Sequence, residues 1–502
     1  MNEKIAIIDL GSNTARLVAL SYQPETCFKL EDELREPVRL SENMGESKII
    51  RAEAAKRGID ALKAFKTYCD AVGISKIHAT ATSAVREAVN GASFLAAVEK
   101  SVGLKPEILA GEKEAYYGTL AVANSLNYQD ALVLDLGGGS LQLSYMKNRK
   151  FKSGQSWPLG AVRSTELFFA DEIVKKKEAK ELIKKTSESI AEYLEDVPKG
   201  LPIIGMGGTV RNLANIAKKA NGDRLELIHN YHFSLNDLDK ITEGLITKTV
   251  AERKKITGLN SDRADIITAG AIVIREVLDY YQAKEIIISG QGIREGLFYS
   301  YLFPKNDHLV KDLRSFSINN LAKRYYDFPK HNKHVRKLSL LLFEQLAPLH
   351  GYGDWERDLL AQAAIVHDIG MAINYYDHHK QGQMLVIGSA LAGFSHREQA
   401  IISLLVRFHR KGKPSALGLD SVLEKGDLER LSKLAALLRL AEYLERSKAQ
   451  RVQDLRCHIA EQYLQIEVLA EDDVSVEIKE AILHSDLLAN AYGVEVEIVL
   501  GH

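Results

Sequence analysis

KIAIIDLGSNTARLVAL, at residues 4–20, has a second version later in the chain, ALVLDLGGGSLQLSYM at residues 131–146. In each, an apolar run rich in Ile, Val and Leu is followed by Asp-Leu-Gly, small polar residues and a second apolar run. That order is typical of a buried strand, a glycine turn and a returning strand. Alignment on Asp-Leu-Gly pairs two carboxylates and two short loops: Asp9 with Asp135, and Gly11, Ser12, Asn13 and Thr14 with Gly137, Gly138, Gly139 and Ser140.

Both loops have the composition of a phosphate-binding turn. Glycine lets the backbone approach a ligand closely, so that successive N–H groups point at phosphate oxygens. A carboxylate at the end of the strand can hold Mg²⁺, often through water. A single such loop is more often an ordinary hairpin turn. The repeat favours the functional interpretation, because it predicts two related domains that face one cleft.

The composition sets outer limits on the function. The 502 residues are enough for two to four domains, and the formal net charge of −1 gives no overall attraction to nucleic acid or to a membrane. No apolar run approaches the ~20 residues that span a bilayer, and the N-terminus has no signal-peptide pattern. Three widely spaced cysteines indicate reduced thiols, so we expect a cytoplasmic protein.

Six segments carry a resemblance to a known family. They are DLGSNTARL (9–17), TATSAVREA (80–88), LAGEKEAYYG (109–118), LDLGGGSLQLS (134–144), IGMGGTVRNLA (204–214) and SGQGIREGLFY (289–299). Together they resemble the exopolyphosphatase and guanosine pentaphosphate phosphohydrolase (Ppx/GppA) family, within the actin, Hsp70 and sugar kinase superfamily. The resemblance implies two ribonuclease-H-like α/β lobes, which we place at residues 1–125 and 126–304.

The resemblance also implies roles for single residues. Glu114 would be the general base that activates water, and Arg86 would bind the phosphoryl group. Asp135 would help to hold Mg²⁺. A third glycine turn, at Gly207, Gly208 and Thr209, would join the two repeated loops around Asp9 and Asp135 in binding phosphate. The chain departs from the family at Gln142, where a glutamate is usual, and this puts the metal role of that position in doubt.

From about residue 305 the apolar spacing becomes helical, and histidines recur in AAIVHDIG (363–370), DHHKQG (377–382) and RFHRKGK (407–413). This region, residues 305–449, resembles an HD-type helical domain. Three of its metal-ligand positions match His331, His367 and Asp368, and the fourth carries Glu442 where aspartate is usual. The region is therefore either a second metal site or a fold kept for its packing and basic surface. Residues 450–502 predict a small α/β appendage.

Together these features predict a Mg²⁺-dependent hydrolase that removes terminal phosphates from inorganic polyphosphate. The alternative substrate is pppGpp, cleaved at the same site. Two other classes stay open: a kinase or ATPase with a nucleotide pocket at residues 290–292, and a regulator of weak activity. The resemblance further implies a homodimer, and we expect neither a nucleic-acid nor a membrane partner.

Overall fold

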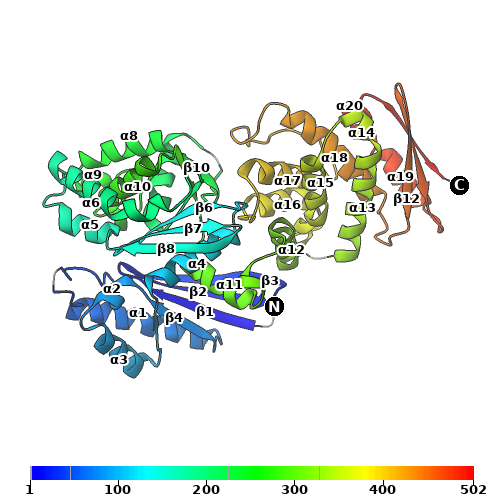
Figure 1. Ribbon diagram of the computed structural model, residues 1–502. Helices are drawn as coiled ribbons and strands as arrows, with labels where there is room; N and C mark the ends of the chain where they lie inside the picture. Colours follow the sequence, from blue (N-terminus) through cyan, green and yellow to red (C-terminus); the bar gives the residue numbers. More distant parts are fainter. Residues whose placement is uncertain (1–2, 46, 224, 327, 502) are drawn as a thin grey trace. The chain divides into compact units, whose positions relative to one another are not determined.

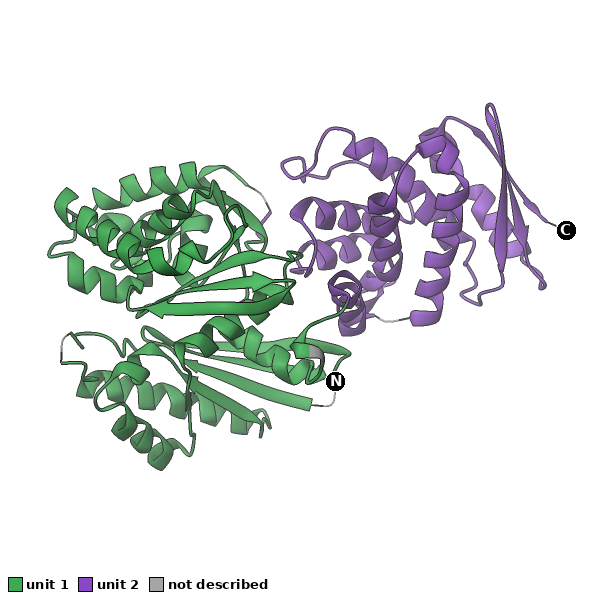
Figure 2. Ribbon diagram, in the orientation of Figure 1, with its two compact units in different colours: residues 1–223, 227–311 green, residues 224–226, 312–502 purple. Residues whose placement is uncertain are grey.

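The computed structural model describes residues 3–45, 47–223, 225–326 and 328–501. The chain forms two compact units, residues 1–223 with 227–311, and residues 312–502 with the short stretch 224–226 (Figure 2). The first unit contains both copies of the repeat. The finer boundaries at residues 125, 304 and 449 stay predictions.

The first copy of the repeat forms the centre of a five-stranded sheet with the order β3-β2-β1-β4-β5 (Figure 1). β1 runs antiparallel to β2 and parallel to β4. The apolar residues of β1 and β2 are buried, as expected for central strands that are covered on both faces. The strands are β1 (Glu3–Leu10), β2 (Thr14–Gln23), β3 (Cys27–Pro37), β4 (Ile77–Ala81) and β5 (Glu107–Ile108).

The second copy forms a sheet with the same order and the same strand directions, β8-β7-β6-β9-β11, extended by β10 at its edge. The two related lobes predicted from the repeat are thereby confirmed. The strands are β6 (Ala131–Leu136), β7 (Leu141–Lys147), β8 (Lys150–Trp157), β9 (Ile203–Met206), β10 (Tyr231–Ser234) and β11 (Glu285–Ile288).

Helices cover these sheets, and two of them lie between the lobes. α4 (Gly111–Ala123) packs on β7 and β8, and α11 (Ile293–Leu302) packs on both α4 and β1 (Figure 1). This layering brings the loops at the ends of β1 and β6 toward each other. The remaining helices of the unit are α1 (Ala52–Ala71), α2 (Ser83–Glu87), α3 (Gly91–Val102), α5 (Ala161–Phe168), α6 (Lys176–Glu195), α7 (Gly208–Ala220), α8 (Leu235–Ile246), α9 (Val250–Arg253) and α10 (Ile267–Tyr281).

The second unit is mainly helical and ends in a three-stranded sheet with the order β12-β13-β14. One apolar core joins its helices to the inner face of that sheet, through residues such as Leu464 and Ile466. Both the helical region and the α/β appendage therefore agree with the prediction. The elements are α12 (Leu313–Tyr325), α13 (Pro329–Gln345), α14 (Ala347–His350), α15 (Asp354–Val366), α16 (His378–Ile387), α17 (His396–Phe408), α18 (Asp427–Tyr443), β12 (Asp454–Ala460), β13 (Tyr463–Leu469), α19 (Ser475–Leu483), α20 (Asp486–Tyr492) and β14 (Glu495–Leu500).

Candidate active site

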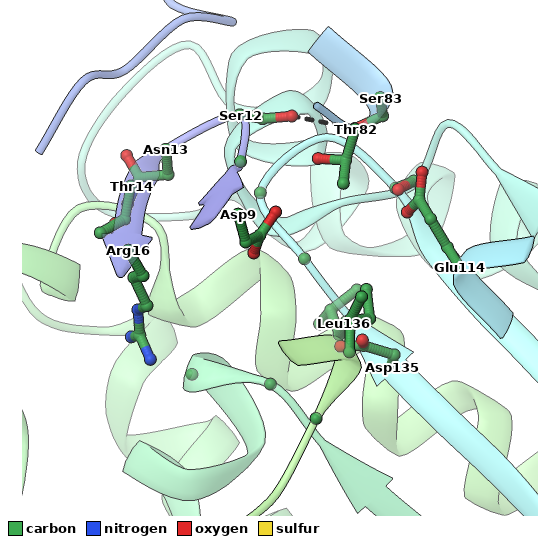
Figure 3. Close-up of a pocket in the computed structure, with 18 of the residues that line it drawn as sticks. Asp9, Ser12, Asn13, Thr14, Arg16, Thr82, Ser83, Glu114, Asp135 and Leu136 are labelled. Carbon is green, nitrogen blue, oxygen red and sulfur yellow. Dashed lines mark hydrogen bonds between the residues drawn. The ribbon is translucent and has the colours of Figure 1, made fainter. Parts of the chain in front are cut away.

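The two repeated loops form the same turn. Gly11 N–H donates to the Thr14 carbonyl at 3.3 Å, and Gly137 N–H donates to the Ser140 carbonyl at 3.0 Å. The register of the flanking strands also matches, since Asp9 lies opposite Arg16 and Asp135 lies opposite Gln142. Both loops line one cavity in the first unit (Figure 3).

Three carboxyl groups lie at this cavity: Asp9, Asp135 and Glu114 (Figure 3). Burial raises the pKa of Glu114 to about 8 and that of Asp135 to about 6, and the neighbouring carboxylates add to both shifts. Burial also raises the pKa of Asp9, whose buried Oδ1 has no hydrogen-bond partner among the described residues. Converging carboxyl groups with raised pKa values and an unsatisfied oxygen fit a hard divalent cation such as Mg²⁺.

Glu114 lies in the first turn of α4 and is buried, with an exposed fraction of 3%. Arg86, at the end of α2, forms an ion pair with one of its carboxylate oxygens. Gln142 Nε2 donates to the other oxygen at 2.7 Å. Both oxygens of the carboxylate are therefore held, and its direction is fixed by groups from both lobes.

Four arginines also line the cavity: Arg16, Arg211, Arg263 and Arg294. Burial lowers the pKa of Arg16 to about 10 and that of Arg263 to about 9, and charge repulsion from neighbouring arginines contributes to both shifts. Arg294 is partly neutralised by Glu33, at 2.8 Å. Guanidinium groups that crowd one another in a cavity favour a ligand with several negative charges.

Most of the predicted site residues lie together at this cavity. Its lining includes Asp9, Gly11, Ser12, Asn13, Thr14, Glu114, Asp135, Gly137, Gly138, Ser140, Gly207 and Gly208. Arg86 lines a neighbouring pocket and reaches the cavity through Glu114. Thr209 is fully buried behind the lining. Gly139 packs close to the hydroxyl groups of Ser12 and Ser83.

The sequence prediction missed three of the arginines and the hydrogen bonds of Gln142. The repeat contains a signal for Arg16, because Arg16 and Gln142 each follow the repeated aspartate by seven residues. Arg211 follows the third glycine turn and lies on the first turn of α7. Arg263 is the last residue of the short 3-10 helix Ser261–Arg263. The sequence around it contains no motif that indicates a place in the site. Arg294, which pairs with Glu295 at 3.9 Å in the first turn of α11, also lines the cavity.

The second unit contains a separate buried cluster. The four residues predicted as a possible metal site come together, with ligand atoms within 4.8 Å of one another: His331, His367, Asp368 and Glu442. A second group shares Asp368 and adds His378 and His409, which the sequence segments contained but could not place. Burial opposes a charge on His331, yet hydrogen bonds to neighbouring carboxylates outweigh it and raise its pKa to about 10.

No described helix is long and apolar enough to cross a membrane.

The duplicated sheets and their facing turns define a two-lobed α/β protein with one cavity between glycine turns, lined by carboxyl groups and arginines. Comparison with known families is more specific. The model of the Ppx/GppA phosphatase family matches residues 24–304, and the model of its domain III matches residues 313–491. The chain belongs to the Ppx/GppA phosphatase family.

Individual relatives agree with this assignment. The chain is 27% identical, over 448 residues and 86% of each sequence, to a guanosine-5'-triphosphate,3'-diphosphate pyrophosphatase of Pseudoalteromonas translucida. It is also 27% identical to a Ppx/GppA family member of Aquifex aeolicus, with a TM-score of 0.53 over 60% of this chain and 97% of that one. An exopolyphosphatase from Cytophaga hutchinsonii shares the fold, with 24% identity and a TM-score of 0.57 over 61% of this chain and 99% of that one.

Proposed function

We propose that the protein removes the terminal phosphate of inorganic polyphosphate by hydrolysis, with Mg²⁺ bound at the cavity of the first unit. The observation that carries this proposal is the charge of the cavity lining. Three carboxyl groups and four arginines line the same cavity. A bound cation would neutralise the carboxylates, and a bound polyanion would neutralise the arginines. Among the described lining residues none is aromatic, so the lining offers no aromatic ring on which a nucleobase could stack.

Binding would depend on backbone groups and arginines. The turns at Gly11, Gly137 and Gly207 would donate N–H groups to the phosphate oxygens, as glycine-rich turns do in other phosphate sites. The guanidinium groups of Arg16, Arg211 and Arg263 would neutralise the chain behind the terminal phosphate. Asp9 and Asp135 would hold Mg²⁺, which supplies positive charge to the phosphate oxygens.

In the reaction, a water oxygen attacks the terminal phosphorus and the bond from that phosphorus to the bridging oxygen breaks. The Glu114 carboxylate accepts a proton from the water, and the shortened chain leaves with the bridging oxygen. The raised pKa of Glu114, about 8, makes it a stronger base than a surface glutamate. Arg86 and Gln142 hold its two oxygens, so the free lone pairs keep one direction.

The second candidate is hydrolysis of pppGpp at the same cavity. The observation in its favour is the curated relative from Pseudoalteromonas translucida, which matches 86% of this chain. The reacting groups would be the same, because both substrates end in a phosphoanhydride. A preference for pppGpp would require a guanine site outside the lining residues described above.

Phosphate release with Mg²⁺ from long-chain polyphosphate and from pppGpp tests both candidates. Glu114→Gln should lower the rate on the preferred substrate by a factor of about 10²–10⁴, as expected for the loss of a general base. Glu112→Gln is the matched control, since Glu112 is exposed on the same helical turn. An active Glu114→Gln variant combined with an inactive His367→Ala variant would move the chemistry to the second unit and overturn the proposal.

A further inference from the structure

A second cavity of the first unit lies against α4, the helix whose first turn carries Glu114. Its volume is about 230 Å³, and its walls come from α4, from the turn and second strand of the β7–β8 hairpin, and from residues 307–309. The hairpin packs directly on α4 (Figure 1). This cavity, which we call the α4 cavity, shares no described lining residue with the candidate active site.

The wall of the α4 cavity is apolar and partly aromatic. Tyr116 of α4 and Phe151 of β8 meet edge to face, with ring centroids 5.9 Å apart and an angle of 81° between the rings. Leu120 and Leu309 extend the wall. Aromatic edges and faces attract a further flat ring. An apolar cavity of about 150 Å³ is enough for one benzene ring, so this cavity can take a somewhat larger flat ring system.

A half-buried arginine without a carboxylate partner stands beside this wall. Arg149 lies in the turn between β7 and β8, and its Nε and Nη2 donate to the Ala123 carbonyl at 3.1 and 2.8 Å. Burial lowers the pKa of Arg149, and no described acidic group offsets this effect. Nη1 donates to no described residue, so its two N–H groups are available to a ligand. A guanidinium group in this state favours an anion.

The other charged groups at the cavity neutralise each other. Lys150 Nζ lies 2.6 Å from Asp307 Oδ2, and the two side chains are 62% and 65% exposed. An exposed ion pair of this kind contributes little to stability, so it can open when a ligand enters. The lining thus has one net positive charge, from Arg149, next to an apolar wall. This combination fits an apolar ligand with one negative charge.

We propose that the α4 cavity binds a flat aromatic carboxylate, with the ring against Tyr116 and Phe151 and the acid group on Arg149. A nucleoside monophosphate has the same two features, a flat ring and an anionic group. Cavities that enclose a whole ligand usually measure about 300–1,000 Å³, so the sugar and phosphate would lie outside this smaller one. A phosphate monoester also carries more than one charge, whereas the lining offers one. Both comparisons favour the carboxylate.

Isothermal titration calorimetry on the full chain tests this proposal with three probes: naphthoate, its neutral amide naphthamide, and adenosine monophosphate. Naphthoate should bind, and naphthamide, which has the same shape without the charge, should bind more weakly by a factor of about 10–100. Adenosine monophosphate should bind more weakly than naphthoate. Equal affinity for acid and amide, or no binding of naphthoate, would overturn the proposal, and tighter binding of the nucleotide would overturn the choice of carboxylate.

Variants locate the binding. Arg149→Met should reduce the affinity for naphthoate to that for naphthamide, and Arg275→Met is the matched control, because Arg275 does not line the cavity. Since Arg149 also holds the end of α4, a second variant leaves it in place: Leu309→Trp fills the cavity and should abolish binding of both naphthalene probes. A preference for the acid that survives in Arg149→Met would overturn the role of Arg149.

The α4 cavity can be tested apart from the proposed hydrolase site. Glu114→Gln should bind naphthoate as the wild type does, and polyphosphate should not compete with naphthoate, because the two cavities share no described lining residue. Competition by polyphosphate would place naphthoate in the first cavity and overturn the proposal. Loss of hydrolysis in Glu114→Gln leaves the calorimetric result unchanged, so each site can fail without the other.

Discussion

Gln142 Nε2 donates a hydrogen bond of 2.7 Å to Glu114 Oε2 and a second one of 2.8 Å to the Ser140 hydroxyl. The amide therefore connects the second glycine turn to the proposed base, which comes from the other lobe. A glutamate at position 142 could not donate these bonds. In this chain a neutral donor occupies the position, and its amide holds one carboxylate oxygen of the proposed base.

Replacement of Gln142 by glutamate should make the stability of the protein depend on Mg²⁺. Gln142→Glu adds a fourth carboxyl group beside Glu114, Asp9 and Asp135, and like charges in a buried site repel. We expect the free energy of unfolding to fall by about 1–3 kcal/mol in EDTA, and Mg²⁺ to restore part of it. Urea unfolding with and without Mg²⁺ measures both. Gln142→Met loses the hydrogen bonds but adds no charge. Any fall in its free energy of unfolding should therefore be the same with and without Mg²⁺.

The rate of phosphate release should fall as the pH falls. A general base works as the carboxylate, so activity is present above the pKa of Glu114 and is lost below it. Burial raises this pKa from 4.5 to about 8, and bound Mg²⁺ would bring it down again. The acid limb of kcat/KM should therefore have a slope of one and a midpoint between these two values. Glu112→Gln should leave the profile unchanged, and a flat profile down to pH 5 would contradict the assignment of Glu114.

Loss of Arg263 should weaken binding more than it slows the reaction. Its guanidinium group lies against Gly208 at the cavity, and charge-assisted hydrogen bonds to phosphate contribute about 1.5–3 kcal/mol. Arg263→Met should therefore raise KM for polyphosphate by a factor of about 10–100 and reduce the effect of salt on KM. The control is Arg275→Met, because Arg275 of α10 pairs with Asp239 of α8 and does not line the cavity. An equal change in both variants would argue against a site-specific role.

Two glycine-to-alanine changes should have opposite effects. A Cβ at Gly160 would lie 2.3 Å from the Ser140 backbone nitrogen and 2.4 Å from the Gly138 carbonyl, so Gly160→Ala must displace the second phosphate turn. We expect at least a tenfold loss of phosphate release and roughly 1–3 kcal/mol of destabilisation. Gly244 lies inside α8 with open space around it, so Gly244→Ala should raise the free energy of unfolding by about 0.5–1 kcal/mol. Urea unfolding and phosphate release compare the two, and an active Gly160→Ala variant would contradict the close packing.

The sequence determined the duplicated sheets and the positions of their turns. Both features are local, because an apolar run, a glycine turn and a second apolar run specify their own strands and the register between them. The repeat placed Asp9 and Asp135 at equivalent strand ends, and the structure has them in the same cavity. The resemblance supplied Glu114 and Arg86, whose contact the structure contains.

Only the tertiary structure decided which distant side chains meet. Arg263 reaches the cavity from a short helical segment, and His409 joins Asp368 from the end of α17. Neither position differs locally from many surface arginines or core histidines. Their roles depend on how helices far apart in the sequence pack, which is set by apolar surfaces spread over each unit. The spacing of residues along the chain does not contain that information.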